Sequence, residues 1–189
     1  MTNIAIFVSG SGSNCEKIIR HFKDSDLARV VLVVSNKADA YALVRAANEG
    51  IPSVVFSKSD FIDGTAVLAK LKEYDTDFVV LAGFLLKVPD LLIDAFPGRM
   101  INLHPALLPK FGGKGMYGMH VHRAVKEAGE TVTGMTVHYV SSEVDGGGII
   151  AQFSTPLLPD DTPEDIAAKE HILEMEHFPQ VVEDVIKGL

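Results

Sequence analysis

Asn102 and His104 are the residues of this sequence best suited to chemistry, in the segment Asn102-Leu103-His104-Pro105. An apolar pair, Met100-Ile101, precedes them and predicts that they end a strand. Residues i and i+2 of a strand point to the same side, so both side chains can face one reacting atom. An amide donor beside an imidazole that can carry a proton suits a developing oxyanion. In the plainer alternative, His104 caps the strand and Pro105 turns the chain.

Asp145 is the candidate partner of His104. It precedes three glycines, on a turn expected between two late strands. A carboxylate that folds over an imidazole raises its pKa and can relay a proton through water. His138 could support this turn by hydrogen bonding. The alternatives are an ordinary hairpin turn and a partly buried strand histidine.

A glycine-rich segment, Ser9-Gly10-Ser11-Gly12-Ser13-Asn14, follows the first expected strand and opens a helix, which makes Gly12, Ser13 and Asn14 candidate phosphate ligands. Cys15 replaces the third glycine of a dinucleotide-binding loop, and no Gly-Lys-Ser/Thr closes a P-loop. A monophosphate therefore fits best. The alternative is a tight turn with Asn14 as the helix N-cap.

No residue resembles an activated covalent nucleophile, and no histidine spacing indicates a metal site, since His120-Val121-His122 lacks a third ligand nearby. Direct transfer between two bound substrates remains. The chemistry indicated is acyl transfer through a tetrahedral oxyanion.

The elements that must position these residues follow an α/β pattern, in which apolar runs alternate with segments of helical period. Strands are expected at Ile4–Val8, Val30–Ser35, Ser53–Phe56, Phe78–Ala82 and Met100–Asn102, with helices near Asn14–Phe22, Tyr41–Glu49, Thr65–Lys72 and Asp90–Phe96. The alternating run Thr133–Val140 and the segment Gly148–Phe153 predict an antiparallel pair. A last helix should open at Thr162-Pro163-Glu164-Asp165 and run toward Gly188, with Pro179 interrupting or kinking it.

Composition indicates one globular domain, because 189 residues of which 47% are hydrophobic can bury a full core. The formal charge of −8 argues against nucleic acid or an anionic membrane as partner. No apolar run reaches membrane-spanning length, and the single cysteine, Cys15, is typical of a reducing compartment. We therefore expect a cytoplasmic protein.

Four segments together resemble the phosphoribosylglycinamide formyltransferase family of 10-formyltetrahydrofolate-dependent enzymes. They are Ser9–Asn14, Leu81-Ala82-Gly83-Phe84, Asn102-Leu103-His104-Pro105-Ala106-Leu107-Leu108-Pro109 and Asp145-Gly146-Gly147, and the resemblance covers almost the whole chain. It implies a Rossmann-like formyltransferase fold with a mainly parallel twisted sheet. It also implies one domain over residues 1–189, with a phosphate-binding part at about 1–100 and a folate-binding, catalytic part at about 101–189.

The resemblance implies that the amine of glycinamide ribonucleotide attacks the formyl carbon of 10-formyltetrahydrofolate, a co-substrate, in purine synthesis without a metal. Asn102 and His104 would stabilise the oxyanion, and Asp145 would orient His104 and help move the proton. Gly12, Ser13 and Asn14 would hold the phosphate, Glu174 would contact the ribose, and His171 would approach the phosphate. The protein would act as a monomer or homodimer on small molecules.

The folate would lie along Phe84, Leu85, Leu86, Lys87 and Val88, beside Asn102 and the segment of Val140, Ser141, Ser142, Glu143 and Val144. This chain has Leu86-Lys87 where relatives often have an arginine, and it has a glycine-rich run, Phe111–Met119, where many have a short turn. That run is either a mobile flap over the amine site or a neutral insertion. A formyl-folate hydrolase, a transferase acting on another amine and a non-catalytic phosphate-binding module are the remaining alternatives.

Overall fold

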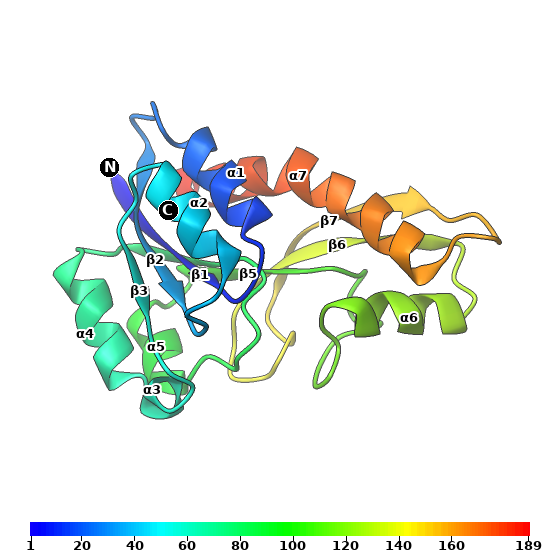
Figure 1. The fold of residues 1–189 in the computed structure, drawn as a ribbon, viewed down its shortest axis with the longest axis horizontal. Coiled ribbons are helices and arrows are strands. Elements are labelled where there is room, and N and C mark those ends of the chain that lie inside the picture. Colours follow the sequence, from blue (N-terminus) through cyan, green and yellow to red (C-terminus); the bar gives the residue numbers. More distant parts are fainter. The chain divides into compact units, whose positions relative to one another are not determined.

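Seven strands and seven helices follow one another along residues 1–189, all of which are described by the computed structural model (Figure 1). The strands are β1 (Thr2–Val8), β2 (Ala28–Ser35), β3 (Ser53–Val55), β4 (Phe78–Leu81), β5 (Met100–His104), β6 (Val132–Tyr139) and β7 (Ile149–Pro156). The helices are α1 (Ser13–His21), α2 (Tyr41–Asn48), α3 (Asp60–Asp63), α4 (Thr65–Glu73), α5 (Asp90–Ala95), α6 (Met119–Glu127) and α7 (Pro163–Lys187). The strand order in the sheet is β3-β2-β1-β4-β5-β6-β7. The predicted α/β class is confirmed.

The chain forms two compact units. The first contains Met1–Ile101 together with Pro179–Leu189, and the second contains Asn102–Phe178. None of the helices combines the length and the apolar composition needed to cross a bilayer.

The first unit is built on parallel strands. β1 pairs with β2 on one side and with β4 on the other, and β2 pairs with β3. Residues Ile4 to Val8 of β1 are completely buried, as expected for a strand covered on both faces. Because the chain runs outward from β1 to β3 and then returns to β4 beside β1, the direction of strand addition reverses between β1 and β4. Ligands of such sheets bind at the carboxyl ends of the strands at this point.

The second unit contains an antiparallel pair, β6 and β7, which confirms the prediction for the two late strands. A side-chain network anchors the segment after His104 to this pair. The buried hydroxyl of Thr136 donates to the Ala106 carbonyl at 2.6 Å and accepts from the Leu108 N–H at 3.0 Å. Gln152 donates to the Leu108 carbonyl at 2.9 Å. Side chains of both β6 and β7 therefore hold the turn that follows the candidate catalytic strand.

The other elements differ from expectation at three places. α1 begins at Ser13 with Gly12 at the N-cap position, so Asn14 is not the N-cap. Pro179 lies inside α7, which runs unbroken from Pro163 to Lys187, so the predicted interruption is wrong. The rest of a long helix retains its hydrogen bonds when one proline removes a single donor. The short helix α3 and the helix α6 were not predicted. In the case of α6, the glycine-rich run obscured the start of the helix.

Gly12 is required where α1 approaches α2, and the two helices lie side by side in Figure 1. Its φ is +76°, in the left-handed region, and a Cβ there would lie 2.4 Å from the Ala42 Cβ. We expect Gly12→Ala to lower the free energy of unfolding by about 2–4 kcal/mol, from backbone strain plus overpacking. Chemical denaturation measures the loss.

Gly10→Ala is the matched control in the same loop. Nothing lies within 4 Å of its added Cβ, and its φ is not positive. We expect a change below about 1 kcal/mol, as for a compatible glycine substitution. Equal stabilities of the two variants would contradict the packing argument.

Candidate active site

Asn102, His104, His138 and Asp145 form one polar cluster in the second unit. Asn102 and His104 lie on β5, His138 lies on β6, and Asp145 lies in the loop between β6 and β7. The nitrogen Nδ1 of His104 is 3.5 Å from Asp145 Oδ2, and Nε2 of His138 is 3.5 Å from Asp145 Oδ1. The structure thus brings together residues up to forty-three positions apart that the sequence had indicated separately.

The surroundings of Nε2 determine which ring nitrogen of neutral His104 carries the hydrogen. Nε2 lies 2.7 Å from the Phe111 carbonyl oxygen. Because a carbonyl only accepts, Nε2 must carry the hydrogen and donate it. Nδ1 is therefore the nitrogen that gains or loses a proton, and it faces Asp145. The carboxylate stands where it favours the imidazolium.

His138 orients the Asn102 amide. Nδ1 of His138 donates to the Tyr139 carbonyl at 2.9 Å, which leaves Nε2 of the neutral ring as an acceptor. The Asn102 amide nitrogen lies 3.1 Å from this Nε2 and donates to it. Nε2 of His138 therefore lies beside both Asn102 and Asp145. The support of the Asp145 turn by a hydrogen bond from His138 stays a prediction.

Backbone geometry holds Asp145 over the histidines. Its φ is +56°, a left-handed conformation that aspartate tolerates better than most residues. The next glycines are required by space, since a Cβ on Gly147 would lie 1.7 Å from the Tyr139 carbonyl oxygen. The N–H of Gly113 donates to Asp145 Oδ2 at 2.9 Å. The glycine-rich run that follows Phe111 therefore contacts the polar cluster directly.

Burial and charge act in opposite directions on these groups. Burial lowers the pKa of His104 below the ordinary histidine value and outweighs the raising effects of Asp145 and the Phe111 carbonyl. Burial opposes the charged form of Asp145. Even so, His138, His104 and the Gly113 N–H together hold the pKa of Asp145 below its usual value. At neutral pH the cluster therefore contains an ionised carboxylate beside a neutral imidazole.

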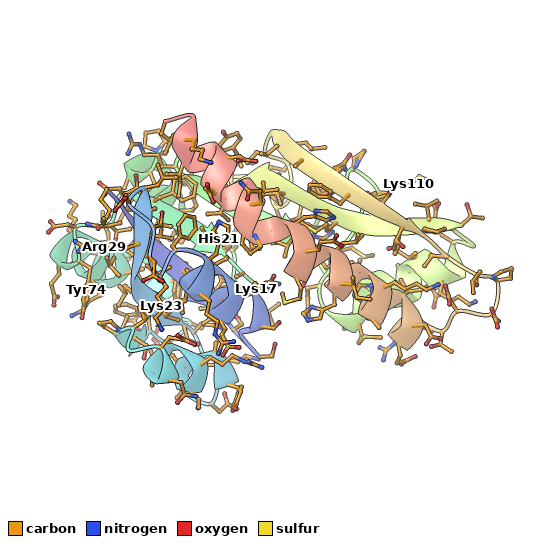
Figure 2. All side chains as sticks on the ribbon, turned by 90° about the horizontal axis from the view of Figure 1, so that it is seen from above. Lys17, His21, Lys23, Arg29, Tyr74 and Lys110 are labelled. Atoms are coloured by element: carbon orange, nitrogen blue, oxygen red, sulfur yellow. The ribbon has the colours of Figure 1, made fainter.

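The glycine-rich loop ends β1 in the first unit and is held at several points. The Ser9 hydroxyl donates to Asn36 Oδ1 at 2.5 Å and accepts from the Leu85 N–H at 2.9 Å. Arg45 on α2 donates to the Ser11 carbonyl at 2.9 Å. The N–H groups of a first helical turn have no partners within the helix, so Ser13 and Asn14 begin a suitable anion site. Lys17, which sits one turn further along, is exposed on α1 with His21 (Figure 2).

The candidate folate residues fall in both units. In the first unit, Phe84 is buried against Phe7 and Phe61. The side chain of Leu85, whose N–H donates to Ser9, is exposed. Leu86 is half-buried, Lys87 is exposed and Val88 is buried. In the second unit, Ser142, Glu143 and Val144 are exposed, while Val140 and Ser141 are half-buried. Each unit therefore presents one of the two expected segments.

His171 and Glu174 form a pair on α7, with His171 Nδ1 3.0 Å from Glu174 Oε2. The hydrogen bond to Glu174 raises the pKa of His171 and so favours its cationic form. His122 of α6 is buried in the same unit. Burial lowers its pKa, although the charge of Glu174 acts to raise it.

Four groups in and near the site were not predicted from the sequence. They are the Phe111 carbonyl, the Gly113 N–H, and the buried side chains of His122 and Glu170. The glycine-rich run was a signal for the first two, but backbone partners have no residue-type signature. No group of three or more His, Cys, Asp or Glu side chains is arranged to bind a metal ion.

Comparison with known proteins gives consistent matches over nearly the full chain. A family profile described as formyl transferase matches residues 2–182. A chloroplastic phosphoribosylglycinamide formyltransferase of Arabidopsis thaliana is 43% identical over 97% of this chain, which spans 66% of that relative. The Haemophilus influenzae phosphoribosylglycinamide formyltransferase is 37% identical over 100% of this chain and 89% of its own length.

A solved structure, glycinamide ribonucleotide transformylase 1 of Symbiobacterium toebii, has the same fold. Its TM-score is 0.90 at 34% identity, over 100% of this chain and 89% of that one. The order of the motifs, the α/β fold and these identities agree. The chain therefore belongs to the phosphoribosylglycinamide formyltransferase family.

Proposed function

We propose that this protein transfers the formyl group of 10-formyltetrahydrofolate to the amine of glycinamide ribonucleotide, giving formylglycinamide ribonucleotide and tetrahydrofolate. The observation that carries the proposal is the cluster of Asn102, His104 and Asp145, with the His104 Nδ1 3.5 Å from the Asp145 carboxylate. Family membership supports the two substrates. The transfer is a step of de novo purine synthesis, and a cytoplasmic location fits the single free cysteine.

The amine lone pair attacks the formyl carbon, and the carbonyl electrons move onto oxygen. One N–H of the Asn102 amide binds His138, and the second would donate to this oxyanion. Once Nδ1 of His104 has taken up the proton that the attacking amine loses, its imidazolium would add a positive charge beside the oxyanion. Collapse of the intermediate breaks the bond to the folate nitrogen. That nitrogen receives a proton, while the attacking amine loses one.

Asp145 supports the proton movement. Its ionised carboxylate faces Nδ1 of His104 and favours a proton there, while burial keeps the imidazole neutral before substrates bind. The carboxylate can also accept a proton from the amine through a water molecule. Nδ1 of His104 and the carboxylate of Asp145 can therefore take up together the proton that the attacking amine loses.

The acceptor's phosphate would bind the first turn of α1, at Gly12, Ser13 and Asn14, with His171 as a cationic partner and Glu174 at the ribose hydroxyls. The chain's net charge of −8 means that an anionic substrate depends on such local donors. The folate would bind along Phe84–Val88 and Val140–Val144.

We expect purified protein to convert 10-formyltetrahydrofolate only when glycinamide ribonucleotide is present. Alanine at Asn102, His104 or Asp145 should each lower kcat by about a hundredfold or more, the scale of losing an oxyanion donor or a proton-transfer group. Folate absorbance follows the reaction. His21→Ala, an exposed histidine of α1 (Figure 2), is the control and should retain wild-type turnover.

The assay separates the alternatives. Turnover without acceptor would indicate a formyl-folate hydrolase, and turnover only with another amine would indicate a different transferase. Wild-type rates in all three cluster variants would refute the mechanism.

Ser13→Ala should mainly raise the KM for the ribonucleotide and leave kcat close to wild type. Phosphate contacts change little between the bound substrate and the transition state, so their loss weakens both alike. Initial-rate kinetics at saturating folate measure the split. An unchanged KM would argue against a phosphate site at this loop.

The pKa of His104 in the free protein should lie below the ordinary histidine value, and Asp145→Asn should lower it further by removing the charge that favours the imidazolium. NMR titration of the imidazole carbon-bound protons measures both. Because the folded pKa lies below the unfolded one, His104 makes the free energy of unfolding rise with pH between the two values. Glu143→Gln, an exposed carboxylate of the same loop, is the control; a wild-type titration in Asp145→Asn would contradict the electrostatic account.

A further inference from the structure

Glu170 is a buried carboxyl group that the proposed chemistry does not use. It lies on α7 one helical turn before Glu174, and only 3% of its surface is exposed. Its side chain is hydrogen-bonded to that of Glu174, which is 9% exposed, and its Oε1 atom has no partner. A carboxyl group held in this way lacks the partners that normally offset its burial.

Two carboxylates in contact and out of water cannot both stay ionised, because each disfavours the charge of the other. Burial raises the pKa of Glu170 well above its usual value, and the charge of Glu174 and the hydrogen bond to it raise it further. Glu174 has a second partner, His171, at 3.0 Å, whose cationic form favours a charged carboxylate. The shared proton therefore belongs on Glu170, which is the donor of the bond.

The charge of Glu174 also acts on a second histidine. His122 of α6 is the other titratable group in this unit that responds to it, and the charge of Glu174 acts to raise the His122 pKa. Glu170 itself responds to Glu174 alone among the charged groups. The neutral acid Glu170, the histidine His171 and the carboxylate Glu174 thus lie close together on α7.

We propose that Glu170 is a positioning residue, which donates its acid hydrogen to Glu174 and so fixes that carboxylate to accept the ribose hydroxyls of the acceptor substrate. This inference rests on the proposed function, in which Glu174 binds the ribose. A carboxylate that accepts one fixed bond on one side presents its remaining lone pairs in a defined direction. The ribose hydroxyls would then meet an oriented acceptor instead of a side chain free to rotate.

Stability alone does not account for a carboxyl group at position 170. Removing one member of a buried polar pair destabilises a protein when the other member is left without a partner. Here Glu174 retains His171. Loss of function without loss of stability would therefore separate a positioning role from a structural one.

Two substitutions test the hydrogen bond. Glu170→Met removes the donor and keeps the volume, and we expect it to raise the ribonucleotide KM about tenfold while kcat changes much less, because the ribose contact is made equally in both states. Glu170→Gln keeps an N–H donor and should retain the wild-type KM at neutral pH. Glu176→Gln, a carboxyl group on the same helix whose side chain is 65% exposed, is the matched control.

The pH dependence gives a second readout. When wild-type Glu170 loses its proton as the pH rises through its raised pKa, two carboxylates face each other, and the ribonucleotide KM should rise. Glu170→Gln has no such proton and should show no such rise. Chemical denaturation of each variant confirms that the protein is folded in the assay.

Glu174→Gln distinguishes failure of this inference from failure of the proposed function. A raised KM in Glu174→Gln with a wild-type KM in Glu170→Met would overturn the role of Glu170 alone. An unchanged KM in Glu174→Gln would overturn the ribose assignment and the inference with it. Infrared difference spectra of the substrate-free protein test the proton directly: the wild type should show a protonated carboxyl band at neutral pH that Glu170→Gln lacks, and its absence would refute the proposal.

Discussion

The carboxylate of Asp145 is the charge on which the polar cluster of Asn102, His104 and His138 depends. It lies 3.5 Å from a nitrogen of each of two buried histidines and accepts the N–H of Gly113. A charge that is largely removed from water must be compensated locally. The Gly113 N–H compensates it by a hydrogen bond, and each histidine does so when its facing nitrogen is protonated. The left-handed backbone conformation of Asp145 and the glycines after it allow the carboxylate to take this position.

The same competition between burial and charge determines which groups carry protons. In His104, burial prevails and the imidazole is neutral, while Asp145 keeps the charged form within reach. In Glu170, burial and the neighbouring Glu174 act in the same direction, and the acid stays protonated. His104 on β5 is therefore a neutral group paired with the carboxylate of Asp145, and Glu170 on α7 is a neutral group paired with that of Glu174. The first of these pairs suits proton transfer, and the second suits fixed orientation.

Close backbone approach is the other constraint on the structure. Gly12 permits the close contact between α1 and α2 beside the glycine-rich loop, and Gly112 permits the segment after Phe111 to pack on Leu108, since a Cβ on Gly112 would lie 2.4 Å from Leu108 Cδ2. The glycine-rich run is thus tied to the catalytic residues through the Phe111 carbonyl and the Gly113 N–H. The interpretation of this run as a mobile flap over the amine site stays a prediction.

The sequence by itself determined the α/β class, the strands of the first unit to within two residues, and the residue types of the candidate site. Periodic burial leaves a strong pattern, and an amide two positions before a histidine on a strand has only one geometric consequence. The sequence also indicated Asp145, through the glycines that its turn needs.

Only the tertiary structure decided which atoms compensate which charges. The tautomer of His104 depends on a carbonyl seven residues away, and any residue at position 111 would present that carbonyl. The orientation of Asn102 depends on His138, thirty-six positions later on another strand. Glu170 has the sequence pattern of an ordinary polar helix residue, and only the structure shows that it is buried. Backbone partners and burial have no signature in residue type, because they arise from the packing of segments that are distant in the chain.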